Sequence, residues 1–211
     1  SEWAKVFVTK FSNQHNLDKL TLAKAINFDL ASDKFVRESI FVHGSVDEVV
    51  EAIFQKFPQV MKKKIHEGLF EGSGDAKQVP LTNLHTLFTN LGTITFGLVT
   101  NDSENNAIKH LEQHNLTQYF DMIIGYDSGY GSKPEPGQLE AFLRKTNLLS
   151  QEVLMIGDST YDLVAANKIS MPCLGVLSGT ANKKDLSAHT PFVIDSIDEL
   201  EAWLKKTFLV R

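Results

Sequence analysis

Hydrophobic residues up to Gly92 recur at intervals of three and four, which is the period of an amphipathic helix. The first apolar stripe opens the chain and consists of Trp3, Val6, Phe7 and Phe11. Further stripes follow a segment with the spacing of a helix-capping box, 45–48, and follow Pro58. The last stripe ends at Gly92, a residue type common at helix C-termini. We therefore predict helices and no convincing strand in this region, with a turn at 71–75.

After Gly92 the pattern changes to short apolar runs that alternate with amphipathic segments. The runs with the length and composition of strands are 94–100, 120–124, 153–156, 173–176 and 192–194. Segments with helical periodicity follow them, at 106–114, 137–145, 161–168 and 197–204. This alternation is typical of βαβ units. We predict an α/β fold with a parallel sheet over residues 81–211, preceded by a helical domain over residues 1–80.

Composition narrows the class of protein without pointing to a function. The chain has 211 residues, of which 42% are hydrophobic and 22% charged, an ordinary globular composition. Its net charge is −5, and the longest block of one charge is Lys62–Lys64, so we expect no nucleic-acid partner. Without a long apolar run or a signal-peptide pattern, we expect no membrane association and a cytoplasmic location. A single cysteine, Cys173, excludes an intrachain disulfide.

Polar residues with chemical potential follow the first two predicted strands of the sheet. Ligands of parallel sheets bind at the carboxyl ends of the strands, so these residues are the candidates for a site. Thr100 and Asn101 offer a hydroxyl and a backbone N–H that suit an anion, although for this fragment alone helix capping by Asn101 or Ser103 is the favoured explanation. Lys133 lies in a loop rich in glycine and proline, where it would face a phosphate or be simply exposed.

Two carboxylates follow the third predicted strand, four residues apart. Asp158 and Asp162 together could hold a hard cation, one of them directly and the other through water. The alternative is that the first aspartate is the N-cap of a helix and the second is a surface residue in its first turn. Any one of these three strand ends is unspecific, and their order along the chain is more informative than each alone.

That order resembles motifs II, III and IV of the haloacid dehalogenase superfamily. The matching residues are Thr100-Asn101, Lys133-Pro134, and Gly157-Asp158 with Asp162. The segments 174–179 and 192–200 are similar to the end of members that resemble phosphoglycolate phosphatases. The helical residues 1–80 resemble the C1-type cap of this group. The resemblance thus implies a Rossmann-like core with a parallel sheet and a helical C1 cap domain.

The resemblance also implies a role for each residue. Thr100 and the backbone N–H of Asn101 would bind phosphoryl oxygens, and Lys133 would neutralise the nucleophile and the phosphate. Asp158 would ligate Mg²⁺, and Asp162 would support the metal through water. The implied reaction is Mg²⁺-dependent hydrolysis of a small phosphorylated metabolite through an aspartyl-phosphate intermediate.

Motif I, which carries the family's nucleophile in the pattern Asp-x-Asp-x-Thr, does not occur in this sequence. The nearest lookalike surrounds Asp29, but Ala31 stands at the second carboxylate position and the preceding residues have a helical pattern. We expect the motif to lie before residue 1, on a central strand of the sheet. The alternative is a catalytically inactive relative that binds a ligand or a partner. A phosphomutase or a dehalogenase on the same core is a further alternative, and sequence leaves the substrate and oligomeric state open.

Overall fold

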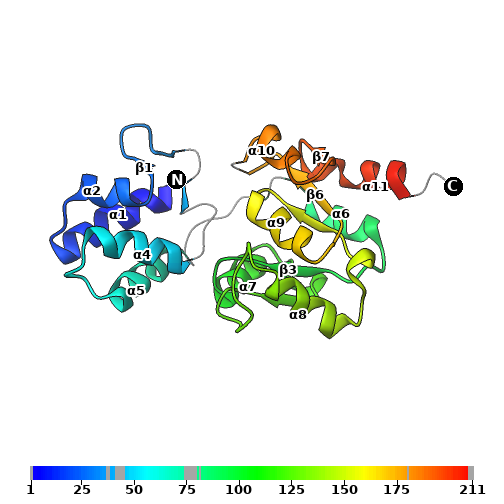
Figure 1. Ribbon diagram of the computed structural model, residues 1–211, viewed down its shortest axis with the longest axis horizontal. Coiled ribbons are helices and arrows are strands. Elements are labelled where there is room, and N and C mark those ends of the chain that lie inside the picture. The colour runs from blue at the N-terminus through cyan, green and yellow to red at the C-terminus, as the bar shows by residue number, and fades with distance from the viewer. Residues whose placement is uncertain are drawn as a thin grey trace. The chain divides into compact units, whose positions relative to one another are not determined.

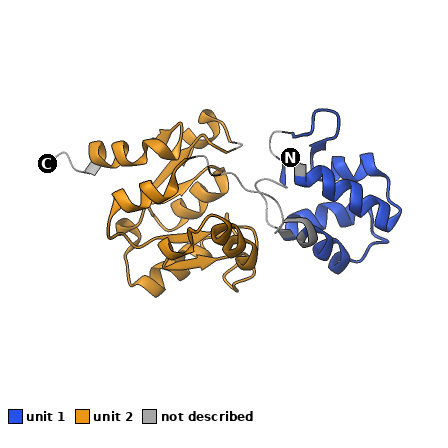
Figure 2. Cartoon of the chain, turned by 180° about the vertical axis from the view of Figure 1, so that it is seen from behind, with its two compact units in different colours: residues 1–77 blue, residues 78–211 orange. Residues whose placement is uncertain are grey.

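The computed structural model describes residues 2–36, 39–40, 46–73, 80, 82–179 and 181–208. The chain forms two compact units, residues 1–77 and residues 78–211, called unit 1 and unit 2 here (Figure 2). The predicted boundary was residue 80. The predicted capping box at 45–48 begins outside the described residues, and the predicted turn at 71–75 lies partly outside them.

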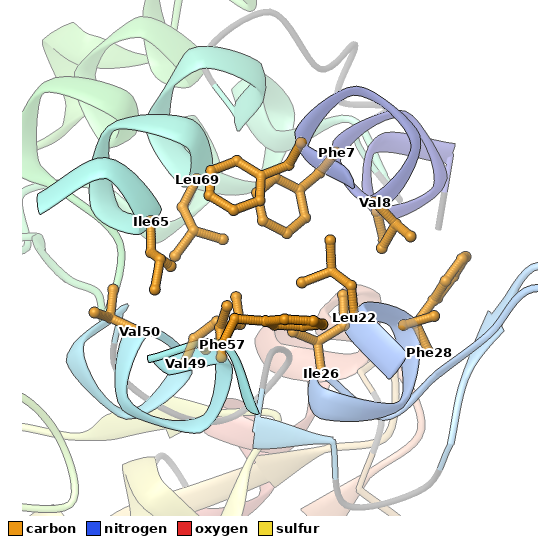
Figure 3. Close-up of a cluster of buried hydrophobic side chains, with 14 of the residues drawn as sticks. Phe7, Val8, Leu22, Ile26, Phe28, Val49, Val50, Phe57, Ile65 and Leu69 are labelled. Atoms are coloured by element: carbon orange, nitrogen blue, oxygen red, sulfur yellow. The ribbon is translucent and has the colours of Figure 1, made fainter. Parts of the chain in front are cut away.

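Unit 1 is built from four described helices and a small hairpin. The helices are α1 (Glu2–His15), α2 (Lys19–Ala25), α4 (Val46–Lys56) and α5 (Lys62–Ser73), and the hairpin pairs β1 (Phe28–Asp29) with β2 (Lys34–Phe35) in antiparallel register. Each helix turns its apolar stripe inward, so that side chains from all four meet in one core (Figure 3). Leu22, Ile53 and Ile65 are completely buried there.

Two details of unit 1 differ from the prediction. The hairpin was not predicted, because strands of two residues are too short to produce an alternating pattern. Helix α5 begins at Lys62 instead of Pro58 and continues to Ser73, into the predicted turn. A continuous row of rings runs along α1, because Trp3, Phe7 and Phe11 are spaced four residues apart and their centroids lie 5.5 and 5.2 Å apart.

The described part of unit 2 contains five parallel strands in two sheets, which confirms the α/β prediction (Figure 1). One sheet pairs β3 (Gly97–Val99) with β4 (Met122–Ile124), and the other has the order β5 (Met155–Gly157), β6 (Cys173–Val176), β7 (Val193–Ile194). The helices are α6 (Leu84–Leu91), α7 (Glu104–Gln113), α8 (Gly137–Thr146), α9 (Thr160–Lys168), α10 (Lys183–Ser187) and α11 (Leu200–Phe208). Short 3₁₀ turns occupy 117–119, 150–152 and 197–199. None of the described helices has the length and apolarity that crossing a membrane requires.

Among the described strands, β3 and β5 each pair with a neighbour on one side only, and the other side is called the open edge. Thr100 N donates to Ile124 O, so the backbone N–H of Thr100 points toward β4. Met155 N donates to Pro172 O, so the backbone N–H of Met155 points toward the β6 side. Because strand residues alternate, the backbone groups of Val99 and Ile156 point the other way, to the open edges. Among the described residues, no strand pairing joins β3 to β5.

Helix α8 connects the cores of the two sheets. Its Leu139 belongs to the hydrophobic cluster of Met155 on β5, while its Phe142 packs with Met122 on β4. Val99 of β3 touches both clusters. The side chain of Phe142 also lies directly on Gly97, where an added Cβ would come within 2.5 Å of the ring. This packing holds β3, β4 and β5 in one unit.

Candidate functional site

Lys133 and Asp162 form a buried ion pair in unit 2. Lys133 lies in the loop between β4 and α8, and Asp162 lies in the first turn of α9. The lysine Nζ donates to Asp162 Oδ1 over 2.6 Å, and the two side chains are only 10% and 7% exposed. The structure therefore brings together two residues that the sequence assigned to separate motifs. A pair so far removed from water interacts much more strongly than one at the surface.

The lysine also bonds the open edge of β3. Its Nζ donates to the carbonyl oxygen of Val99 over 2.9 Å. An ammonium group with two oxygen acceptors is held in one place, so its charge is fixed near the carboxyl end of β3. The charge of this ammonium is balanced by Asp162, so an anion that contacts Lys133 would share it with that carboxylate.

The side chain of Asn101 locks the Lys133 backbone. Its Oδ1 accepts from Lys133 N over 2.9 Å, and its Nδ2 donates to Lys133 O over 2.8 Å. The amide side chain thus pairs with one residue of the lysine loop as a neighbouring strand would. Its backbone N–H makes no hydrogen bond to any residue that the structure describes, so this group is available to a ligand. The N-cap of helix α7 is Ser103, whose Oγ accepts a hydrogen bond from Asn106 N.

Thr100 presents its hydroxyl at the end of β3. Its Oγ1 accepts a hydrogen bond from Asp102 N over 3.0 Å, which leaves the hydroxyl hydrogen for another acceptor. Its backbone N–H donates to Ile124 O and continues the ladder with β4. The backbone of Thr100 is therefore held by β4, and its hydroxyl is a donor at the same strand end as Asn101.

Asp162 has both carboxylate oxygens engaged by donors. Its Oδ1 accepts from Lys133, and its Oδ2 accepts from Ser159 N at 3.1 Å and from Ser159 Oγ at 2.8 Å. Ser159 in turn caps α9 by accepting from Asp162 N, so the two residues form a capping box. Sequence reasoning missed Ser159, although the Ser-x-x-Asp spacing at the start of α9 was the signal for it.

Asp158 is exposed, in contrast to Asp162. It follows β5 directly, and its carboxylate lies against Gly179, where an added Cβ would come within 1.9 Å of Asp158 Oδ2. Carboxylate oxygens are the ligands that a hard divalent cation prefers. Of the two carboxylates, Asp158 is the one that could ligate such a cation directly, because both oxygens of Asp162 accept hydrogen bonds from Lys133 and Ser159. The part of the chain that the structure describes contains no cluster of three or more residues that could hold a metal.

Asp29, the lookalike of the missing nucleophile, lies in unit 1 on strand β1. Its carboxylate accepts from Ala31 N at 2.9 Å and from Ser32 Oγ at 2.8 Å. These hydrogen bonds lower the pKa of Asp29, with the Ala31 N–H as the largest cause. The residue therefore stabilises the turn between β1 and β2, as a loop carboxylate does.

Comparison with known proteins gives consistent matches. The family model of the haloacid dehalogenase-like hydrolases matches residues 9–176. A phosphoglycolate phosphatase of Vibrio parahaemolyticus is 36% identical over 107 residues, which are 50% of this chain and 47% of that protein. One from Vibrio cholerae is 27% identical over 191 residues, 84% of each chain. The chain thus spans about half the length of several curated relatives that it matches.

Solved structures agree in fold at low sequence identity. A predicted phosphoglycolate phosphatase of Haemophilus somnus has a TM-score of 0.68 at 16% identity, covering 87% of this chain and 90% of that one. A haloacid dehalogenase-like family protein of Streptococcus pneumoniae has a TM-score of 0.63 at 17% identity, covering 95% and 88%. With the family model matching most of its length, this chain belongs to the haloacid dehalogenase-like hydrolases.

Proposed function

We propose that this protein is a phosphatase that hydrolyses a small phosphate monoester, in the manner of a phosphoglycolate phosphatase. The observation that carries the proposal is the junction of Thr100, Asn101 and Lys133 at the carboxyl end of β3. A hydroxyl, an available backbone N–H and a fixed ammonium are the donors that a dianionic phosphate needs. The names of the relatives in Vibrio species support phosphoglycolate as the kind of substrate.

Each donor would have a distinct task. The hydroxyl of Thr100 and the N–H of Asn101 would hold the phosphoryl oxygens in one orientation. Lys133 would offset the negative charge of the phosphate, and the buried Asp162 would keep the ammonium in place. Since phosphoryl transfer depends mainly on positioning and charge, these contributions would lower its barrier.

Asp158 would hold a divalent cation, for which Mg²⁺ is the proposal. Asp162 would act from behind it, since its oxygens already bond Lys133 and Ser159. When bound, the cation would supply positive charge against the phosphoryl oxygens.

The nucleophile in this proposal is an aspartate on a further strand between β3 and β5. Its carboxylate would attack the phosphorus, the P–O bond to the substrate alcohol would break, and the alcohol would leave after taking up a proton. Water would then cleave the aspartyl-phosphate and release inorganic phosphate. The open edges of these strands support it, because strands of a parallel sheet normally pair on both sides except at the sheet boundary. Such a strand would place its carboxyl end between Thr100 and Asp158.

The second candidate is a phosphate-binding protein without turnover. The observation in its favour concerns Lys133. Among the described residues, Asp162 is the one carboxylate that the lysine ammonium contacts, so no carboxylate nucleophile lies beside it. The two candidates share the phosphate site and differ only in the presence of a nucleophile.

Two measurements on the protein purified at its full encoded length, and not on residues 1–211 alone, test the proposal. Isothermal titration calorimetry with inorganic phosphate measures binding, and p-nitrophenyl phosphate with Mg²⁺ or with a chelator measures turnover. Lys133→Met should abolish phosphate binding, and the control Lys168→Met should not, because Lys168 pairs with Glu135 at the surface. Magnesium-dependent turnover supports the phosphatase, and binding without turnover supports the second candidate. Equal phosphate binding by Lys133→Met and the wild type would refute both.

A further inference from the structure

Gln138 is a polar side chain in a position where an apolar one would pack. It lies in the first turn of α8 and is completely buried. Its helix neighbours Leu139 and Ala141 are also buried, with exposed fractions of 4% and 1%. Its Nε2 donates to the carbonyl oxygen of Thr100 over 2.8 Å. Its Oε1 is buried and has no hydrogen-bond partner among the described residues. Burying an amide with half of its bonds unmade is costly, so packing alone does not explain the glutamine.

The hydrogen bond of Gln138 fixes a peptide group of the proposed site. The carbonyl of Thr100 and the N–H of Asn101 belong to the same planar peptide unit, and in a trans peptide they point in opposite directions. Holding the carbonyl toward Gln138 therefore aims the N–H of Asn101 away from α8. That N–H is the donor proposed above for a phosphoryl oxygen.

Among the described residues, the other hydrogen bonds of this segment restrain that peptide group only indirectly, since the bond from Asp102 N to Thr100 Oγ1 spans it without engaging its own carbonyl or N–H. Thr100 N is fixed by Ile124 O, and the Asn101 side chain is fixed by the Lys133 backbone. Both anchors lie outside the peptide unit that joins Thr100 to Asn101. Rotation of this unit by half a turn would point a carbonyl oxygen at the phosphate in place of an N–H. The bond from Gln138 opposes that rotation directly.

We propose that Gln138 is a positioning residue that keeps the Thr100–Asn101 peptide oriented for phosphate binding. The inference rests on the proposed phosphate site and deepens it, since it adds a residue that acts on the ligand only through Asn101. A residue with this role affects the affinity for phosphate more than it affects folding, because replacing it also removes the buried Oε1 without a partner.

The test is the affinity of the chain for inorganic phosphate in the variant Gln138→Met, which keeps the length of the side chain and loses the donor. We expect phosphate binding to weaken about tenfold, the equivalent of one hydrogen bond, with little change in melting temperature. In an NMR titration, the amide signal of Asn101 should shift with phosphate in the wild type and much less in the variant. Gln113→Met is the matched control, since Gln113 is an exposed glutamine on α7.

Several outcomes separate this inference from the proposed function. Wild-type affinity in Gln138→Met, with an unchanged Asn101 signal, would overturn it. If that variant does not fold, Gln138→Asn, whose amide is too short to reach Thr100, serves in the same titration. Failure of the wild type to bind phosphate would refute the proposed function instead. In that case the carbonyl ¹³C shift of Thr100 decides, because loss of the bond must move it and an unchanged shift would overturn the inference.

Discussion

Replacing Asp162 by alanine should destabilise unit 2 severely, because it leaves the Lys133 ammonium buried without its anion. The two side chains are 10% and 7% exposed and their charged atoms lie 2.6 Å apart, so water cannot replace the lost partner. Breaking such a buried pair costs about 3–5 kcal/mol. Because a domain of this kind is stable by about 5–15 kcal/mol, the variant should lose a large part of its stability.

Urea unfolding followed by tryptophan fluorescence measures this loss. The chain has two tryptophans, Trp3 in unit 1 and Trp203 in unit 2, so the background substitution Trp3→Phe leaves a signal from unit 2 alone. The control is Glu140→Gln in the same unit, which removes an exposed pair with Arg144 at 3.8 Å. That control should change the free energy of unfolding by less than about 0.5 kcal/mol.

A double-mutant cycle separates the charge effect from the loss of packing. Removing both charges in Lys133→Met/Asp162→Ala should cost less than the sum of the two single variants, since no buried charge remains without a partner. A loss below about 1 kcal/mol in Asp162→Ala, which is the range of surface pairs, would refute the reasoning.

Three further predictions address other parts of the chain. Burial raises the pKa of the Cys173 thiol above its usual 9.0. The stability that the neutral thiol contributes is therefore fully present below pH 9 and is lost as the pH rises through the higher, folded-state pKa. Urea midpoints measured from pH 7 to 10 should fall more in the wild type than in Cys173→Ala, and parallel curves would contradict this. Asn101→Ala should cost about 1–3 kcal/mol in unit 2, because it leaves the N–H and carbonyl of Lys133 without partners, and an unchanged urea midpoint would contradict this. Ile65→Ala should cost unit 1 about 2–5 kcal/mol through the cavity it leaves, measured by Trp3 fluorescence in a Trp203→Phe background, and a loss typical of surface sites would contradict it.

Most elements of the fold could be predicted from the sequence where a pattern extends over several turns or a whole strand. The helix predicted at 137–145 is α8, residues 137–146, and the strand predicted at 173–176 is β6 at the same bounds. Short elements were not predicted. Each strand of the β1–β2 hairpin has only two residues, and helix α10 has only five. Their formation depends on the residues around them, since a few positions carry no detectable period.

The sequence by itself determined the change from helical to alternating pattern near Gly92 and the order of the polar strand ends. Those features depend on neighbouring residues, and the hydrophobic period records them directly. It also determined which side chains are candidates, including Thr100, Lys133 and Asp158.

Only the tertiary structure decided how the candidate residues act on one another. It joined Lys133 to Asp162 across 29 positions of sequence, assigned the Asn101 side chain to the lysine loop, and separated the exposed Asp158 from the buried Asp162. It also revealed Gln138, which no spacing distinguished from a surface glutamine. The physical reason is that burial and hydrogen bonding between distant segments depend on how helices pack over strand ends, and local periodicity does not record that packing.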